Sequence, residues 1–209
     1  MKSFLELLTI YTIQLFIIVD PLAGIPIFLA ITSHKTKAER RIMARRSCFI
    51  AFIVIVFFLL AGASLLSYFG IKTTAVQICG GILLFLIALE FLYGRTTQTE
   101  TTNLEERLAG EKEDVSVTPL AIPLLAGPGA IATSLVFAAR AHDLLTYAVL
   151  VTGTAIVFAA VYLCLHWADD LARMIGVLGM KIITRIIGFL LAFMAVQYVI
   201  DGIRDQFFS

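Results

Sequence analysis

The chain has 209 residues, of which 60% are hydrophobic and only 15% are charged, and its mean hydropathy is +0.96. Soluble domains carry about 25% charged residues. The composition therefore excludes an ordinary soluble protein and favours roughly six membrane-spanning helices of about 20 residues each. The net charge is +1 and no basic face is interleaved with aromatic residues, which argues against a nucleic-acid partner. The three cysteines lie singly in apolar segments, so neither a disulfide framework nor a zinc site is predicted.

The first predicted span covers about residues 4–32 and is interrupted by the stretch Asp20-Pro21-Leu22-Ala23-Gly24-Ile25-Pro26. Proline removes a backbone donor and glycine tolerates conformations that other residues avoid, so this span is predicted to be a broken helix. In lipid, freed backbone groups are tolerated only where they face protein or a water-filled cavity. The apolar run is too long for a cleavable signal peptide, so the span is expected to be retained.

Five further spans follow in the sequence, which predicts an all-α polytopic membrane protein with six transmembrane helices. They cover about residues 48–69, 75–93, 118–139, 144–167 and 182–203. A basic loop precedes the second span, a short turn at 70–73 follows it, and a polar loop at 95–117 follows the third. One short surface helix is expected near residues 104–109 of that loop.

A second break lies in the fourth span, at Ile122-Pro123-Leu124-Leu125-Ala126-Gly127-Pro128-Gly129-Ala130. All five prolines of the chain lie in or next to the two broken stretches. Two matched breaks in corresponding places of two halves are the best sequence indication of a transporter's binding site.

The two halves also match elsewhere. A repeat of three spans forces the second unit to enter from the opposite side, which predicts a 3+3 inverted repeat with units at 1–94 and 118–209, joined by the loop at 95–117. The corresponding positions are Leu22-Ala23-Gly24 with Leu125-Ala126-Gly127, Gly81-Ile82-Leu83-Leu84 with Gly188-Phe189-Leu190-Leu191, Ala88 with Ala195, and Glu90 with Gln197.

The distribution of lysine and arginine predicts the orientation, because basic residues concentrate in cytoplasmic loops. Of the 16 basic residues, 12 lie in the segments after the first, third and fifth spans, which places those segments in the cytoplasm and both termini outside. The 12 residues are Lys35, Lys37, Arg40, Arg41, Arg45, Arg46, Arg95, Arg107, Lys112, Arg173, Lys181 and Arg185.

Asp20 is the most distinctive single residue. A carboxylate within a span costs about 2.5 to 3.5 kcal/mol on insertion scales, so it normally faces a cavity or a partner. One interpretation is a site for a cation, a proton or a substrate ammonium group. The other is an N-cap for the half-helix that begins at Pro21, since Asp followed by Pro suits the start of a helix. The two roles can coexist.

The second break is the candidate site for an anion. Gly127, Gly129 and Ala130 would expose amides at a helix start, where the helix dipole favours a carboxylate, although the break can also be a packing kink. Thr133 lies one turn on and could add a hydroxyl, and Gly24 is the counterpart of Gly127. Weaker candidates are Glu90, for ion or proton coupling, and Gln197, for substrate; either can instead lie at the interface in water.

These motifs resemble the MarC family of bacterial and archaeal six-span membrane proteins, which includes small neutral amino acid transporters of the SnatA type. The resemblance covers nearly the whole chain. Family members often carry Asn in an Asp-Pro-x-Gly-Asn-x-Pro motif, where this chain has Ala23 to Ile25, and the lost polar side chain bears on substrate choice. The most specific stretches are Asp20-Pro21 with Gly24 and Pro26, residues 119–131, and Arg185-Ile186-Ile187-Gly188 with Gln197 and Gly202.

The resemblance implies secondary transport of amino acids such as glycine or alanine, driven by protons or sodium, in a prokaryotic plasma (inner) membrane. No cofactor beyond that coupling ion is expected. The expected partners are the amino acid and the lipid bilayer, and a homo-oligomer stays open.

Three alternatives stay open beside this interpretation. The first is an exporter of amino acids or small drugs, because sequence does not give direction. The second is an intramembrane hydrolase that pairs Asp20 with Asp201 or Glu90, which conflicts with the different depths expected for Asp20 and Asp201. The third is a non-transporting scaffold, which leaves the paired breaks unexplained.

Overall fold

The computed structural model describes residues 2–93, 125–141 and 143–207. Helices make up 91% of this described part, which contains no strand. Five helical segments in it are long and apolar enough to cross a membrane, and a shorter apolar helix accompanies them. The five segments are Phe4–Ile31, Lys37–Tyr68, Thr73–Tyr93, Leu144–His166 and Leu178–Phe207, and the shorter helix is Pro128–Ala139. The predicted surface helix near 104–109 lies outside the described residues.

The predicted break in the first span is confirmed. Helix α1 (Lys2–Val19) ends immediately before Asp20, and α2 (Pro21–Ile31) begins immediately after it. Asp20 is the one non-glycine residue with positive φ in the described part of the chain, at φ 38° and ψ 70°. Such a left-handed residue cannot continue a right-handed helix, and aspartate tolerates it because its short polar side chain bonds locally.

Helix α3 (Lys37–Tyr68) begins well before the span expected at residue 48. The expectation of a basic loop up to that span is therefore wrong, because Arg40, Arg41, Arg45 and Arg46 all lie on α3. Thr36 starts the helix by a capping box, in which its hydroxyl accepts from the Glu39 N–H while the Glu39 carboxylate accepts from the Thr36 N–H.

The helices of the second half agree with the predicted spans over most of their length. Helix α6 (Pro128–Ala139) is the second part of the expected fourth span, whose first part lies outside the described residues. Helix α7 (Leu144–His166) ends one residue before its predicted end. Helix α8 (Ala168–Phe207) is longer than expected and bends at Gly176, where φ is 68°.

Helix α4 (Thr73–Tyr93) packs against α8 through glycines at two places. A Cβ atom at Gly81 would stand 2.7 Å from the Ala195 carbonyl oxygen, and one at Gly188 would stand 3.2 Å from the Ala88 carbonyl oxygen. Only glycine allows backbones to approach this closely, as at many interfaces between membrane helices.

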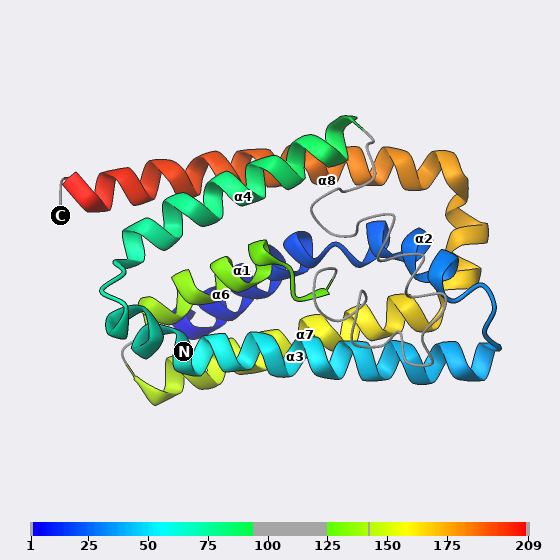
Figure 1. Cartoon of the computed structure of the whole chain (residues 1–209), viewed down its shortest axis with the longest axis horizontal. Helices are drawn as coiled ribbons and strands as arrows, with labels where there is room; N and C mark the ends of the chain where they lie inside the picture. The colour runs from blue at the N-terminus through cyan, green and yellow to red at the C-terminus, as the bar shows by residue number, and fades with distance from the viewer. Residues whose placement is uncertain (1, 94–124, 142, 208–209) are drawn as a thin grey trace.

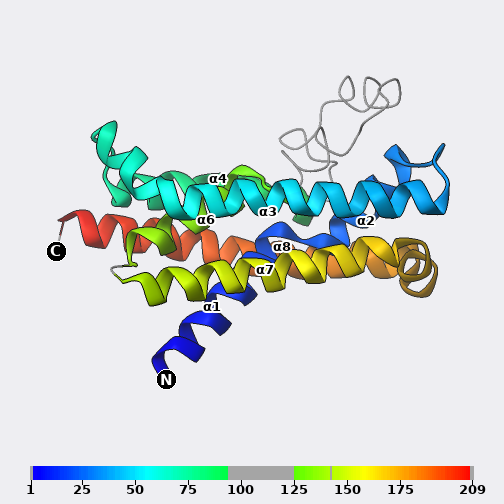
Figure 2. The ribbon, with the colours of Figure 1, turned by 90° about the horizontal axis from the view of Figure 1, so that it is seen from below.

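Two helix pairs form the sides of the bundle, α4 with α8 and α3 with α7, and α2 and α6 lie between these pairs (Figure 1). The N-terminal part of α1 extends away from the bundle (Figure 2). The half-helix α2 packs against α7 and α8, whereas the half-helix α6 packs against α3 and α4. Both chain ends lie at one end of the long axis, which we call the terminal end (Figure 1). The α2–α3 and α7–α8 connections lie at the opposite end, which we call the basic end.

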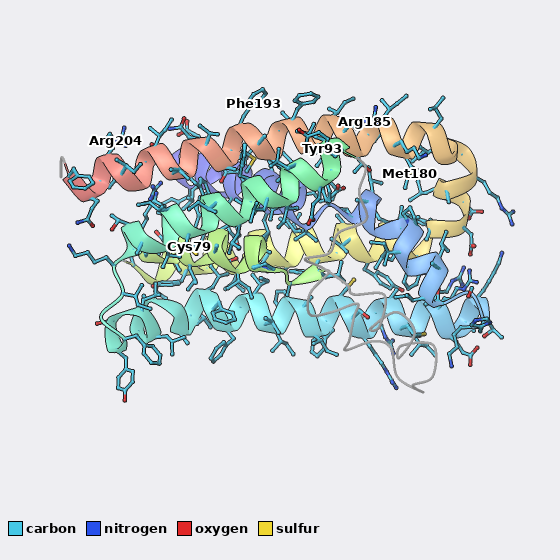
Figure 3. All side chains as sticks on the ribbon, turned by 45° about the horizontal axis from the view of Figure 1, so that its top comes forward. Cys79, Tyr93, Met180, Arg185, Phe193 and Arg204 are labelled. Atoms are coloured by element: carbon cyan, nitrogen blue, oxygen red, sulfur yellow. The ribbon has the colours of Figure 1, made fainter. Side chains whose placement is uncertain are left out.

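The outer surface of the bundle is apolar. Phe193 on α8 is 68% exposed and points away from the bundle (Figure 3). Other exposed apolar side chains recur every three or four residues along α3 and α8, as expected for faces solvated by acyl chains. They include Phe49, Ile53, Phe57 and Leu60 on α3, and Ile182, Ile186, Phe189, Val196 and Ile200 on α8.

Candidate functional site

Asp20 lies buried at the junction of α1 and α2, with only 3% of its surface exposed. One carboxylate oxygen, Oδ1, accepts a hydrogen bond of 3.3 Å from the Ala23 N–H and so caps α2. The other, Oδ2, has no hydrogen-bond partner among the described residues. The predicted capping role is therefore present, and it leaves one buried oxygen without a donor, which is a costly arrangement unless something binds there.

The start of α6 differs from the start of α2. Its N-cap is Gly127, which has no side chain, and none of the described side chains caps the helix. Pro128 occupies the first position, and the first bonded amide is that of Ile131, which donates to the Gly127 carbonyl at 3.1 Å. The amides of Gly129 and Ala130 therefore stand where a helix leaves its N–H groups without intrahelical acceptors.

Gly24 does not offer an amide in the same way. Its N–H donates to the Asp20 carbonyl oxygen at 3.2 Å, and the Ala23 N–H is already held by the Asp20 side chain. The α2 start is therefore neutralised by the chain's own carboxylate, whereas the α6 start carries the partial positive charge of its dipole without a counter-charge from a cap.

The end of α1 contacts the start of α6. A Cβ atom at Gly129 would stand 3.3 Å from Ile18 Cγ2 near the end of α1, and 2.7 Å from Leu84 Cδ2 on α4. Gly129 is thus needed for close packing, and its side-chain direction is filled by Leu84 rather than open to a ligand. Since Ile18 lies two residues before Asp20, the end of α1 that leads into Asp20 contacts the start of α6.

Thr133 is fully buried, and its hydroxyl has no hydrogen-bond partner in the part of the chain that the structure describes. The phenol of Tyr198 lies beside it, without the geometry of a hydrogen bond between them. Thr133 belongs to a set of polar side chains between α1 and its neighbours, which we call the polar seam. Its members are Tyr11, Gln14, Thr133, Ser134, Thr154 and Tyr198.

Hydrogen bonds in the polar seam join four helices. The Tyr11 hydroxyl lies 2.9 Å from Thr154 Oγ1 on α7 and 3.3 Å from Ser134 Oγ on α6. The Tyr198 hydroxyl on α8 donates to Gln14 Oε1 on α1 at 3.1 Å. The sequence alone did not single out Tyr11, Thr154 or Tyr198, because each resembles an ordinary residue of an apolar helix. The spacing of Tyr11 and Gln14, three residues apart on one helix face, is the signal that could have found the seam.

Two predicted site residues lie elsewhere. Gln197 is exposed on α8, and its side-chain amide donates to Asp201 Oδ1 of the same helix at 2.9 Å. Glu90 is half-buried near the C-terminal end of α4. The structure places Gly24 within a hydrogen bond of Asp20, and it places Gly129 against Ile18 near the end of α1. Among the described residues, no group of three or more His, Cys, Asp or Glu side chains gathers as a metal site would.

At the basic end, Arg40 ties three elements together. Its guanidinium donates to the Thr32 carbonyl at the C-terminus of α2 over 2.9 Å and to Asp169 Oδ1 on α8 over 3.1 Å. A weaker contact of 3.4 Å reaches the Ser33 carbonyl. Arg40 therefore links the C-terminal end of α2 to α8 through a hydrogen bond and an ion pair.

The chain matches the family described as MarC family integral membrane protein over residues 5–207. It is 35% identical over 196 residues to the UPF0056 membrane protein YvbG of Bacillus subtilis, covering 93% of each chain. It is 32% identical over 201 residues to the UPF0056 membrane protein YhcE of Escherichia coli, covering 94% of this chain and 92% of the relative. A UPF0056 membrane protein of Archaeoglobus fulgidus is 33% identical over 195 residues, covering 93% and 91%.

No solved structure matches the chain. The names of these relatives state a membrane location and no activity, and the bacterial relatives suggest the inner membrane for this chain. A match over nearly the whole chain, together with the apolar helices described above, shows that the chain belongs to the MarC family of integral membrane proteins.

Proposed function

We propose that the protein is a secondary transporter of small neutral amino acids, with its substrate site between the breaks of the first and fourth spans. One observation carries the proposal: the end of α1, which leads into a buried carboxylate, contacts the start of α6, and among the described residues neither Asp20 Oδ2 nor the α6 start has a side-chain partner. A broken helix inside a membrane protein is tolerated where it lines a binding site.

The two half-sites have opposite polarity, which suits a zwitterion. Asp20 Oδ2 would accept from the substrate ammonium group, and the amides of Gly129 and Ala130 would donate to the substrate carboxylate. Because Asp20 already occupies the α2 start, only the α6 start is left for an anion. The surrounding side chains are large and apolar, among them Leu84 and Ile18, which favours substrates as small as glycine or alanine.

The inverted repeat is supported by reciprocal contacts between α4 and α8. Gly81 faces Ala195, and Gly188 faces Ala88. In the repeat, Gly81 corresponds to Gly188 and Ala88 to Ala195, so each contact maps onto the other, as a two-fold axis between the halves requires. The contacts of α2 and α6 follow the same rule. Helix α2 packs against α7 and α8, and α6 packs against α3 and α4, which are the counterparts of α7 and α8 in the other half.

The coupling ion is a proton or sodium, and Asp20 is the residue that would carry or bind it. Glu90 is a second candidate for coupling, since it is half-buried on α4.

The test is uptake of labelled glycine or alanine into proteoliposomes that hold the purified protein. We expect accumulation that depends on an imposed gradient of protons or sodium and is absent from liposomes without protein. Binding without gradient-dependent uptake would contradict secondary transport, and efflux that exceeds uptake under the same gradient would indicate an exporter.

A competition experiment tests the carboxylate position. Ethylamine has the ammonium group and methyl group of alanine but lacks the carboxylate. We expect a large excess of ethylamine to leave labelled alanine bound, whereas unlabelled alanine displaces it. Equal competition by ethylamine would place the carboxylate away from the α6 start.

A further inference from the structure

We infer that Tyr11 and Tyr198 form the closure of the substrate site on the terminal side of the breaks. This inference rests on the proposed function, because only a transporter must open α1 away from its neighbours. Both tyrosines lie on the terminal side of the breaks and are buried, with 0% and 8% of their surfaces exposed. The Tyr11 hydroxyl connects α1 to α6 and α7. The Tyr198 hydroxyl connects α8 to α1.

Tyr11 is held from two sides. Its ring packs edge-on against Phe137 of α6 at a centroid distance of 5.0 Å, and its hydroxyl reaches Thr154 of α7 at 2.9 Å. A Cβ atom at Gly153 would stand 2.8 Å from the Tyr11 ring, so α7 has a glycine where the ring crosses it. The middle of α1 is therefore fixed to α6 and α7 through one side chain.

The hydroxyls of Tyr11, Ser134 and Thr154 form one connected set. Thr154 donates to the Leu150 carbonyl, and Ser134 lies within a hydrogen bond of both the Ala130 carbonyl and the Tyr11 hydroxyl. Tyr11 donates its one hydrogen to the nearer partner, Thr154, and its contact with Ser134, at 3.3 Å, is the longer of the two.

Two hydroxyls near this contact lack a hydrogen-bond partner. Thr12 Oγ1 and Thr133 Oγ1 are both buried without hydrogen-bond partners among the described residues. Partly satisfied polar groups weaken a closed interface, and water that enters on opening supplies the missing partners. Opening this interface therefore costs less free energy than separating α4 from α8, where the backbones pack closely at glycines.

The experiment measures how fast a membrane-impermeant, charged thiol reagent labels Thr133→Cys in a protein whose three native cysteines are replaced. Thr133 is fully buried, so labelling reports opening of the seam. Tyr11→Phe and Tyr198→Phe keep the rings and remove only the hydroxyls. Each should raise the labelling rate about fivefold, the factor that corresponds to one neutral hydrogen bond, and the double variant should raise it further.

Tyr162→Phe is the matched control, because the Tyr162 hydroxyl bonds His166 within α7 and joins no second helix. Thr154→Val and Gln14→Ala remove the partners instead of the tyrosines and should give the same acceleration, which covers the case of a tyrosine variant that does not fold. Unchanged labelling in the folded variants would overturn the closure, whatever the uptake assay gives. Faster labelling without uptake would leave the closure standing and remove the proposed substrate.

Discussion

Asp20 combines a helix cap with a buried oxygen that has no hydrogen-bond partner among the described residues. Its left-handed backbone and its bond to the Ala23 N–H end one helix and begin the next, while Oδ2 stays available. The Asp-Pro pair in the sequence was enough to predict the cap and the break. The unpartnered oxygen could not be predicted, because it depends on which neighbouring helices surround the residue.

Substitutions at Asp20 separate these two roles. Asp20→Asn keeps a capping oxygen and tolerates the left-handed backbone, so we expect near-normal thermal stability together with loss of gradient-driven uptake. Asp20→Ala loses both features and should also lower the free energy of unfolding by about 1 to 2 kcal/mol. Melting curves and uptake measured on the same preparations check this, and normal uptake by the Asn variant would refute the binding role.

Asp143, the N-cap residue of α7, makes a pH-dependent contribution to the stability of the protein. It caps α7, and hydrogen bonds from the Thr146 hydroxyl and backbone hold its pKa below the usual value for aspartate. A lowered pKa means that the stabilisation is present above the unfolded pKa and is lost as pH falls through the folded one. Asp143→Ala should therefore melt below the unsubstituted protein at pH 7, and the difference should shrink towards pH 3. A constant difference across that range would show that the charge is not the cause.

At the scale of helices, the two half-helices were predicted well, because proline and glycine act locally. Each begins with proline at its first position, at Pro21 and Pro128. The start of α3 was missed for the opposite reason: hydropathy reports the length of the apolar segment, and a helix continues beyond it wherever charged side chains remain solvated. The signal was in the sequence as Thr36-Lys37-Ala38-Glu39, the pattern of a capping box.

The α4–α8 pair depends on glycine at the crossing, and Gly81→Ala tests it. Alanine favours helix more than glycine by about 1 kcal/mol, yet here its Cβ would meet the Ala195 backbone at 2.7 Å. We expect overpacking to win and the free energy of unfolding to fall by about 1 to 3 kcal/mol.

Gly179→Ala is the matched control for this substitution. Its Cβ would stand 2.8 Å from Ile175 Cγ2 of the same helix, a side chain that can shift where the Ala195 backbone cannot, so Gly179→Ala should lower stability less than Gly81→Ala. Thermal denaturation in detergent compares the two variants. A stability of Gly81→Ala equal to or above that of Gly179→Ala would rule out tight packing at the crossing.

For the whole molecule, the sequence predicted which segments cross the membrane better than how their side chains meet. The apolar segments identified α4 and α7 almost to the residue. The polar seam escaped prediction because Tyr11, Ser134 and Thr154 are far apart in sequence and meet only through packing. Gln197, a candidate through its place in the repeat, faces outward because position in a repeat does not fix which side of a helix is buried.

The orientation of the molecule is open to a direct test. Both chain ends lie at the terminal end, away from the arginines at the start of α3 (Figure 1). Since basic residues favour the cytoplasm, a reporter that works only outside the cytoplasm should be active after Ser209 and silent after Lys37. The reverse pattern would invert the molecule in the membrane.

The depth of the break has an electrical consequence. Asp20 is residue 17 of the 28-residue segment Phe4–Ile31, which places it near the middle of that candidate span. A cation that reaches it from either side crosses about half of the membrane potential, which amounts to about 1 kcal/mol for each 100 mV. The apparent affinity for the coupling cation should therefore change about sevenfold when 100 mV is imposed across vesicles. The fraction of sites occupied by the cation would then change with the membrane potential, even at constant ion concentrations.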